Sequence, residues 1–208
     1  LPENKGLGHA LRIAVDKCNH EIIARMDSDD IAVNIRFETQ LQIMAENPDI
    51  DIVGGDIVEF IDEIDHKVGK RSVPIPDERI KEYMKKRCPF NHVTVMYRKD
   101  AVQKAGGYKD LFWNEDYFLW IRMAELGCKM ANTGTILVNV RVGTDMYKRR
   151  GGKEYFASEL FLQKYMLQRK MIDGMTFVGN ILKRFTLQVL IPNQIRGWVF
   201  RNFARERV

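Results

Sequence analysis

Helix-like and strand-like patterns alternate along most of this 208-residue chain, and this alternation limits the fold more than any other feature. Apolar side chains recur at helical spacing within residues 10–15, 34–46, 77–87 and 115–126. Strand-like runs lie between or after them, at residues 21–26, 50–61, 92–98, 129–131 and 136–142, with Gly54-Gly55 interrupting the second run. Strands that alternate with helices predict an α/β layer fold. From Gly151 onward the pattern is helical.

The sheet is expected to be incomplete at its beginning. Residues 1–8 have the pattern of a loop that leads into a helix, and the first strand-like run follows only after that helix. Open α/β sheets bind ligands at the carboxyl ends of their strands, and an opening strand normally contributes to that edge. The sequence therefore predicts an α/β sheet that is truncated at its start.

Charge divides the chain into two parts. The formal net charge is +5, but residues 148–208 carry 13 Lys and Arg against 4 Asp and Glu, a balance of +9 that leaves −4 for residues 1–147. We expect a catalytic body over residues 1–147 and a basic helical extension over residues 148–208. No apolar run reaches the roughly 18 residues of a membrane span, and the first residues lack a secretory pattern. The three scattered cysteines, Cys18, Cys88 and Cys128, favour a reducing compartment.

A cluster of acidic residues directly follows the first strand-like run. Asp27, Asp29 and Asp30 come after residues 21–26, where a turn can direct their carboxylates into a shared space. Close carboxylates repel one another unless a cation or hydrogen-bond donors lie between them. Mg²⁺ takes one or two carboxylates and completes its shell with water and phosphate oxygens. The alternative is a solvated turn in which Asp30 or Ser28 caps the next element.

A second acidic pair precedes a strongly apolar helix-like segment. Glu115 and Asp116 follow Asn114 and stand before residues 117–123, so they are expected in the first helical turn. One interpretation is structural, with Asn114 as the N-cap and the two acids favoured by the positive end of the helix. The other is that a carboxylate kept ionised there acts as general base toward a hydroxyl nucleophile.

Short motifs in a fixed order connect these acidic groups to a known family. The motifs are Asn4-Lys5-Gly6-Leu7-Gly8, Arg25-Met26-Asp27-Ser28-Asp29-Asp30, Ile52-Val53-Gly54-Gly55, Pro89-Phe90-Asn91-His92, Ala105-Gly106-Gly107-Tyr108, Glu115-Asp116, and Arg141-Val142-Gly143 leading to Arg149-Arg150-Gly151-Gly152. Each motif is weak alone, whereas their order and spacing together are specific. In these motifs the sequence resembles glycosyltransferase family 2, inverting enzymes with the GT-A fold, over essentially the whole chain. Within that family it is most similar to bacterial transferases that build capsule, exopolysaccharide or lipopolysaccharide.

The resemblance implies a truncated GT-A (Rossmann-like) sheet flanked by helices, with a helical extension at the C-terminal end. It also implies a nucleotide-diphospho-sugar donor and Mg²⁺ or Mn²⁺. Asp27 and Asp29 match the DxD motif, so Asp29 is expected to bind the metal and Asp27 both the metal and the donor nucleotide. Asp30, Asn4 and Gly6 are expected to contact the donor as well.

By the same resemblance, Asp116 matches the acid of the family's "ED" motif and would be the catalytic base. It would take a proton from a hydroxyl of a saccharide or lipid-linked acceptor, which attacks the anomeric carbon in a single displacement. Family members open with a strand, helix and strand that build much of the nucleoside pocket, and we expect that segment to be missing here.

Five residues have weaker claims to contact the acceptor or the diphosphate. Glu115 adjoins the expected base, and His92 precedes a strand, where a purely structural role is equally expected. Trp113 could stack on an acceptor sugar or belong to the core. Arg149 and Arg150 could clamp a diphosphate or form a solvated basic loop.

The basic extension has an amphipathic pattern. One predicted helical face carries Val178, Ile181, Leu182, Phe185 and Val189, away from Lys183 and Arg184. A second segment, after Pro192-Asn193, carries Ile195, Trp198, Val199 and Phe203 among Arg196, Arg201, Arg205 and Arg207. The resemblance favours peripheral contact with an anionic membrane, because the acceptors of this enzyme class are often lipid-linked, and it implies a cytoplasmic protein on the inner face of the plasma membrane. The alternative is a subdomain packed on the core, and no nucleic-acid recognition module is apparent.

Two other functions are compatible with these patterns. One is a sugar-1-phosphate nucleotidyltransferase, which would use a related α/β layer and a metal to make the sugar nucleotide. The other is a non-catalytic glycan- or membrane-binding module with a degenerate site. The sequence does not specify the sugar, the nucleotide, the acceptor or the oligomeric state.

Overall fold

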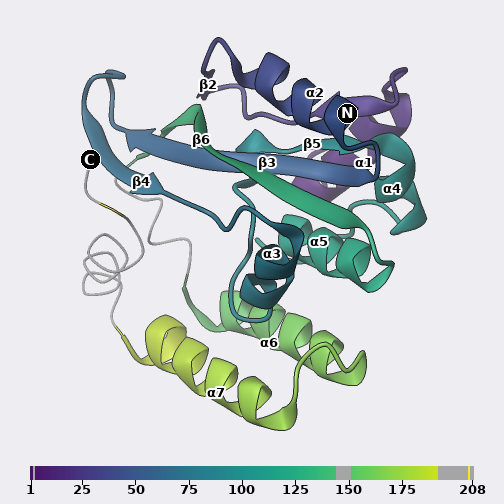
Figure 1. Cartoon of the computed structure of the whole chain (residues 1–208). Helices are drawn as coiled ribbons and strands as arrows, with labels where there is room; N and C mark the ends of the chain where they lie inside the picture. The colour runs from purple at the N-terminus through teal and green to yellow at the C-terminus, as the bar shows by residue number, and fades with distance from the viewer. Residues whose placement is uncertain (2, 144–150, 192–205, 207–208) are drawn as a thin grey trace.

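The computed structural model describes residues 1, 3–143, 151–191 and 206, and it shows one mixed sheet with helices on both faces (Figure 1). The strands are β1 (Ile22–Ala24), β2 (Ile31–Ala32), β3 (Ile50–Phe60), β4 (Lys67–Arg71), β5 (Met96–Arg98) and β6 (Lys129–Arg141). The α-helices are α1 (Leu7–Lys17), α2 (Arg36–Glu46), α3 (Asp77–Met84), α4 (Lys99–Lys104), α5 (Glu115–Glu125), α6 (Lys153–Gln168) and α7 (Gly174–Phe185). A 3₁₀ turn at His92–Thr94 and a π turn at Thr186–Leu190 complete the described elements. The predicted α/β fold class is confirmed.

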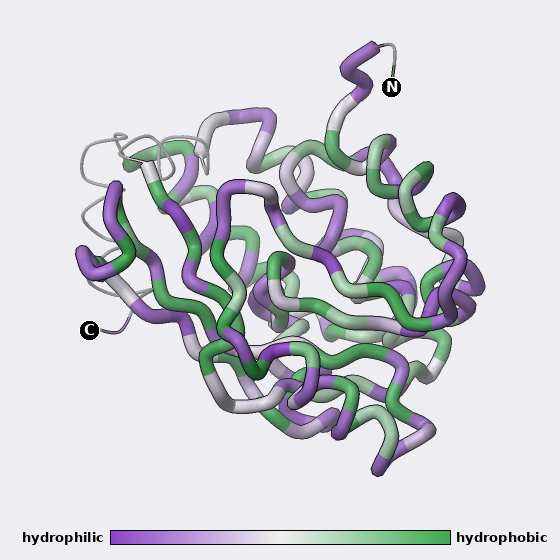
Figure 2. Tube along the Cα trace, turned by 90° about the horizontal axis from the view of Figure 1, so that it is seen from above, coloured by the Kyte–Doolittle hydropathy of each residue, from purple (hydrophilic) through white to green (hydrophobic). Residues whose placement is uncertain are grey.

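The sheet is organised around the parallel pair of β3 and β6. The strand order is β1-β5-β3-β6-β2, and β4 pairs with the second half of β3. All pairs other than β3 with β6 are antiparallel. β3 is buried from Ile52 to Phe60, as is typical of a strand covered on both faces. Hydrophobic stretches of the strands therefore run through the middle of the molecule (Figure 2).

Gly54 and Gly55 do not break β3, contrary to the sequence prediction. The strand continues through them with a register shift against β6 between Gly54 and Asp56. A Cβ at Gly54 would lie 2.5 Å from Asn132 Oδ1, and one at Gly55 would lie 2.6 Å from the Leu137 side chain. The two glycines are needed because neighbouring side chains approach the backbone closely.

The predicted element boundaries are wrong at three further places. The two strands expected after α5 form the single strand β6, in which Gly134 has a left-handed φ of 72°. Residues 92–94 form a 3₁₀ turn rather than the start of a strand, because Thr94 Oγ1 bonds locally to the carbonyl of Asn91 at 2.8 Å. β2, β4 and α4 were not predicted, since short elements carry little periodic signal.

The main core lies between the sheet and α6, with α5 in the middle layer (Figure 1). Every residue of α5 from Tyr117 to Met123 is buried, which explains its unusually apolar sequence. Trp120 is fully buried among aromatic rings, and Leu162 and Met166 of α6 belong to the same cluster. A smaller cluster around Met44 fixes α2 on the opposite face of the sheet.

The described part of the C-terminal extension, α6 and α7, packs against the rest of the chain. α6 contributes apolar side chains to the main core, and α7 is attached both by Phe177, which packs against that core, and by polar contacts to the end of α3. The boundary at residues 147/148 lies outside the described residues, so the division into two domains stays a prediction. Among the described helices, none combines the length and apolar character that crossing a membrane requires.

Candidate active site

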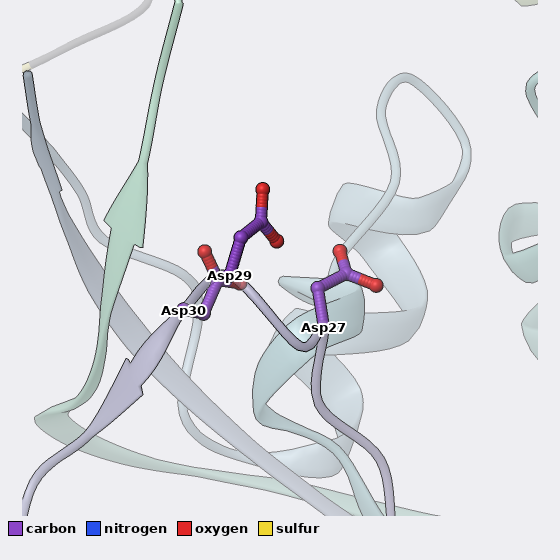
Figure 3. Close-up of side chains that lie close together, drawn as sticks. All are labelled: Asp27, Asp29 and Asp30. Atoms are coloured by element: carbon purple, nitrogen blue, oxygen red, sulfur yellow. The ribbon is translucent and has the colours of Figure 1, made fainter.

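The three acidic residues after β1 lie together, as the sequence predicted. Asp27, Asp29 and Asp30 each offer an oxygen, and these atoms lie within 4.8 Å of one another. β1 ends at Ala24, a turn follows, and β2 then pairs with β6, so the carboxylates lie where the chain reverses at the carboxyl end of β1. Figure 3 shows Asp27 and Asp29 directed to the same side of this turn. We call Asp27, Asp29 and Asp30 the acidic turn.

Asp30 is the buried member of the acidic turn. Its Oδ1 accepts a hydrogen bond of 3.0 Å from the backbone N–H of Arg141 at the end of β6. Its Oδ2 is buried without a hydrogen-bond partner among the described residues. The pKa of Asp30 is raised to about 6, chiefly by burial; the hydrogen bond from Arg141 opposes this shift, and the charges of Asp27 and Asp29 add to it. The repulsion within the turn is therefore only partly compensated by the protein.

Arg25 supplies the partial compensation. Its guanidinium lies 2.6 Å from Asp27 Oδ1, and it is 7% exposed, so this ion pair is shielded on the arginine side. Arg36 of α2 donates to the backbone carbonyl of Arg25 at 2.7 Å, and Gln40 donates to the carbonyls of Val53 and Thr94, both at 2.8 Å. α2 thereby fixes the backbone that leads into the acidic turn.

The acidic turn fits a hard divalent cation. All of its side chains offer carboxylate oxygens, the ligands that Mg²⁺ and Mn²⁺ prefer. The unpartnered oxygen of Asp30 and the half-exposed carboxylate of Asp27 leave acceptor capacity that the described residues do not use. Asp29 is exposed, so a ligand from solvent can reach it.

Asp116 lies in the first turn of α5, as predicted, but its surroundings were not foreseen. Cys88 donates from Sγ to Asp116 Oδ2 across 3.7 Å. Burial raises the pKa of the Cys88 thiol far above its usual value, and the charge of Asp116 adds to this effect, so Cys88 stays protonated and keeps its donor. Asn114 occupies the N-cap position without a capping bond and donates to Ser158 Oγ at 2.8 Å instead.

His92 is electrostatically coupled to Asp116 and to Arg25. A 2.9 Å hydrogen bond joins its Nε2 to Tyr108 Oη, and its ring packs edge-on against Trp120 with 6.0 Å between centroids. Burial lowers the pKa of His92 to about 4; Asp116 opposes this shift and Arg25 reinforces it. The imidazole is therefore neutral near pH 7, and the charges of Asp116 and Arg25 both act on it.

The start of α1 lies against the start of α5. Asn4 Oδ1 accepts a 3.1 Å hydrogen bond from the N–H of Gly6, whose φ of 90° suits the N-cap of α1. A Cβ at Gly8 would lie 2.9 Å from Glu115 Cγ, so only glycine allows this approach. The residues predicted to contact the donor, Asn4 and Gly6, thus precede a helix that begins beside Glu115.

Trp113 is an exposed aromatic residue immediately before α5. Its side chain is 49% exposed, and it packs edge-to-face on Phe112 with 5.5 Å between ring centroids. Its φ of 58° is unusual for a bulky residue and places the ring outside the core. The alternative of a core tryptophan is thus wrong, whereas contact with an acceptor stays a prediction. Arg149 and Arg150 lie outside the described residues.

Sequence comparison identifies relatives of this chain. The sequence profile of glycosyl transferase family 2 matches residues 1–112. An amylovoran biosynthesis glycosyltransferase of Erwinia amylovora is 39% identical over 96% of this chain and 74% of its own length. A UDP-Gal:alpha-D-GlcNAc-diphosphoundecaprenol beta-1,3-galactosyltransferase of Escherichia coli is 35% identical over 99% of this chain and 74% of its own length.

Solved structures share the fold at low sequence identity. S. aureus TarS 1-349 in complex with UDP-GlcNAc has a TM-score of 0.59 at 13% identity, covering 94% of this chain and 60% of that structure. A mannosyltransferase of Pyrobaculum calidifontis in complex with GDP-Man and Mn²⁺ has a TM-score of 0.50 at 13% identity, covering 95% and 54%. This chain spans less than two thirds of either solved structure. The family profile and the relatives show that it belongs to glycosyl transferase family 2, and the solved structures show a GT-A type of fold.

Proposed function

We propose that this glycosyltransferase moves a sugar from a nucleoside-diphosphate sugar to a hydroxyl group of a saccharide or lipid-linked acceptor, with inversion and with Mg²⁺ or Mn²⁺ at the acidic turn. The observation that carries the proposal is the crowding of Asp27, Asp29 and Asp30 within 4.8 Å, with a buried and unpartnered oxygen on Asp30. Such crowding is unfavourable in a chain without a cation partner and is relieved by one.

The relatives indicate the class of substrate. One relative is named for amylovoran biosynthesis and another for galactosyl transfer from UDP-Gal to a diphosphoundecaprenol-linked sugar. One structural neighbour binds UDP-GlcNAc, and another binds GDP-Man and Mn²⁺. We extend these properties to this chain as a role in bacterial cell-surface polysaccharide synthesis, in the cytoplasm and at the inner face of the plasma membrane.

Asp27 and Asp29 are the residues that would hold the cation and the donor diphosphate. When bound, the cation offsets the negative charge that develops on the departing nucleoside diphosphate. Arg25 keeps Asp27 in place through their 2.6 Å ion pair, and Asp30 fixes the turn to β6 through the N–H of Arg141. The protein thus orients the ligands before the donor arrives.

Asp116 is the proposed general base. The acceptor oxygen forms a bond to the anomeric carbon while the bond from that carbon to the diphosphate oxygen breaks, and the acceptor proton passes to Asp116. Because Cys88 donates to Oδ2, Oδ1 is the oxygen proposed to take up the proton. Because His92 is neutral, it adds no positive charge that would weaken the base. Trp113 offers an exposed aromatic face on which an acceptor ring can stack.

A direct assay tests the proposal. The protein, Mn²⁺, a UDP-sugar and a synthetic N-acetylglucosaminyl-diphospho-lipid are expected to release UDP and to form a disaccharide of inverted anomeric configuration. Removal of Mn²⁺ with EDTA should stop the release. Family membership already favours transfer over the nucleotidyltransferase alternative, and pyrophosphate release from a sugar phosphate with a nucleoside triphosphate would contradict the proposal. A chain that binds the saccharide but transfers no sugar with any donor would be the non-catalytic module.

A further inference from the structure

Helix α7 directs several apolar side chains to solvent, although Phe177 on its inner side packs against the main core. The buried residues of α7 are Asn180 and Arg184. The exposed apolar residues are Met175 (86%), Val178 (54%), Leu182 (62%) and Phe185 (40%). A helix on the surface of a globular protein normally has the opposite arrangement, with an apolar stripe facing the core. The sequence predicted one apolar face on this segment, and the favoured interpretation directed that face toward a membrane.

Polar contacts fix this orientation. Asn180 Nδ2 donates to the carbonyl of Lys85 at 2.9 Å and to Gln163 Oε1 at 2.8 Å. Arg184 Nε lies 2.6 Å from Glu159 Oε2, and both side chains are at most 10% exposed. Turning α7 by half a rotation would move Arg184 away and leave the buried carboxylate of Glu159 without its cation, at a large energetic cost. The outward direction of the apolar residues is therefore built into the packing.

The exposed residues form a continuous stripe. Met175, Val178, Leu182 and Phe185 follow one another at spacings of three, four and three residues, which places them on one side of the helix. We call these four residues the α7 stripe; at its end, the Phe185 ring packs edge-to-face on Phe156 of α6, with 5.5 Å between ring centroids. Leu190, 62% exposed, extends the apolar surface beyond the end of the helix.

Positive charge borders the α7 stripe. Lys183 is exposed on α7 itself. A cleft of about 530 Å³ opens beside Thr176, the neighbour of Met175, and its charged lining comprises Glu82, Lys85, Lys86, Lys170 and Asp173. Lysines outnumber acids in that lining, and residues 148–208 as a whole carry a formal charge of +9. An apolar surface bordered by lysines matches an anionic lipid surface, because the apolar side chains enter the acyl region while the ammonium groups meet the phosphates.

We propose that the α7 stripe inserts into the surface of an anionic lipid bilayer and holds this chain there. The inference deepens the proposed location at the inner face of the plasma membrane, on which it rests, and it does not depend on the transfer reaction. A second copy of the chain is a poorer occupant, because a symmetric contact would bring two basic extensions together. The segment at residues 192–205 is also a poorer occupant, since it contains three arginines and no acidic residue and would face the same lysines.

Vesicle sedimentation tests the proposal with a matched pair of variants. The stripe variant carries three changes, Met175→Ser, Val178→Ser and Leu182→Ser. The control variant removes three exposed apolar side chains from the region of α2, on the opposite face of the sheet, with Ile35→Ser, Phe37→Ser and Leu41→Ser. Thermal unfolding verifies that both variants are folded. Vesicles of phosphatidylglycerol and phosphatidylcholine are compared with vesicles of phosphatidylcholine alone, without donor or metal.

We expect the unsubstituted chain to sediment with the anionic vesicles and the stripe variant to partition at least about tenfold more weakly. The control variant should bind within about twofold of the unsubstituted chain, and added salt should weaken binding of all three. Equal binding by a folded stripe variant, or an equal loss in the control variant, would overturn the proposal. Because no sugar is transferred in this assay, an inactive enzyme would leave its result unchanged.

A fluorescent label identifies any other occupant of the stripe. An environment-sensitive dye on Leu182→Cys should shift to shorter wavelength only when anionic vesicles are added. Emission already at the shorter wavelength without lipid would mean that the chain or a second copy covers the stripe, and the proposal would fail. Sedimentation velocity then distinguishes those two occupants, since only the second copy changes the mass.

Discussion

The acidic turn and the first turn of α5 both carry neighbouring carboxylates, yet the protein treats them differently. In the acidic turn three oxygens lie within 4.8 Å, one buried oxygen has no partner among the described residues, and the pKa of Asp30 is raised to about 6. At the start of α5, Asp116 has its own donor in Cys88, and burial raises the pKa of the neighbouring Glu115. Crowded and under-compensated carboxylates favour a cation, whereas a singly held carboxylate is suited to accept a proton.

The largest expected effect comes from Asp116→Asn, which removes the proton acceptor while keeping the shape of the side chain. We expect kcat to fall by about 10² to 10⁴-fold with KM for the donor little changed. The assay is UDP release in the presence of Mn²⁺. Glu125→Gln, at the other end of α5, is the matched control and should keep kcat within about threefold. Full activity of Asp116→Asn would show that Asp116 is not the base, and the two regions would then no longer differ in the roles proposed for them.

Asp29→Asn tests the other side of the comparison. It removes one charge from the acidic turn, and we expect the affinity for Mn²⁺, measured by titration calorimetry without substrate, to fall by about 10 to 100-fold. Asp62→Asn, which changes an exposed acid after β3, serves as the control. Binding of Mn²⁺ that is insensitive to Asp29→Asn would mean that the crowded carboxylates are structural.

His92 sharpens the comparison because charges from both regions act on it. Its pKa is lowered to about 4, so the unfolded chain, with an ordinary value near 6.5, binds the proton more tightly than the folded one. The free energy of unfolding should therefore fall as pH drops from about 6.5 to about 4, by on the order of 2 kcal/mol from this group. Denaturant unfolding of the unsubstituted chain and of His92→Gln at several pH values measures the difference. Equal slopes for both proteins over this pH range would contradict the buried neutral imidazole.

The smallest expected effect is a gain in stability. Asp30→Asn keeps an oxygen that can accept from the N–H of Arg141 and removes a negative charge that burial and two neighbours disfavour. In EDTA we expect the free energy of unfolding to rise by about 1 kcal/mol, and with saturating Mn²⁺ the gain should shrink. A loss of stability in EDTA would show that the charge of Asp30 is compensated, which would weaken the argument for a cation.

Local signals allowed part of this site to be predicted. The acidic turn and the start of α5 follow from short runs of residue types next to clear strand and helix patterns; the structure places these residues as expected, and their roles stay predictions. Arg25, Cys88 and Tyr108 were missed as partners, because each acts through a contact that the sequence pattern does not encode. The contact from Cys88 to Asp116, for example, spans 28 residues.

The fold shows the same limit. β3 and α5 were predicted because their apolar patterns extend over many residues, whereas β2 and α4 are too short to produce one. The outward direction of the α7 stripe depends on Glu159 and on the end of α3, so the periodicity of α7 alone could not reveal it.

The hydrogen bonds of Arg36 and Gln40 have a consequence for inherited variation in this enzyme. These side chains reach from α2 to the backbone of three separate segments, at Arg25, Val53 and Thr94. The location of the acidic turn is therefore determined by a helix that contacts no substrate in the proposed reaction. A substitution at Arg36 would remove the bond to Arg25 while leaving every proposed substrate-binding residue intact, so a survey of damaging mutations would mark α2 as if it belonged to the active site.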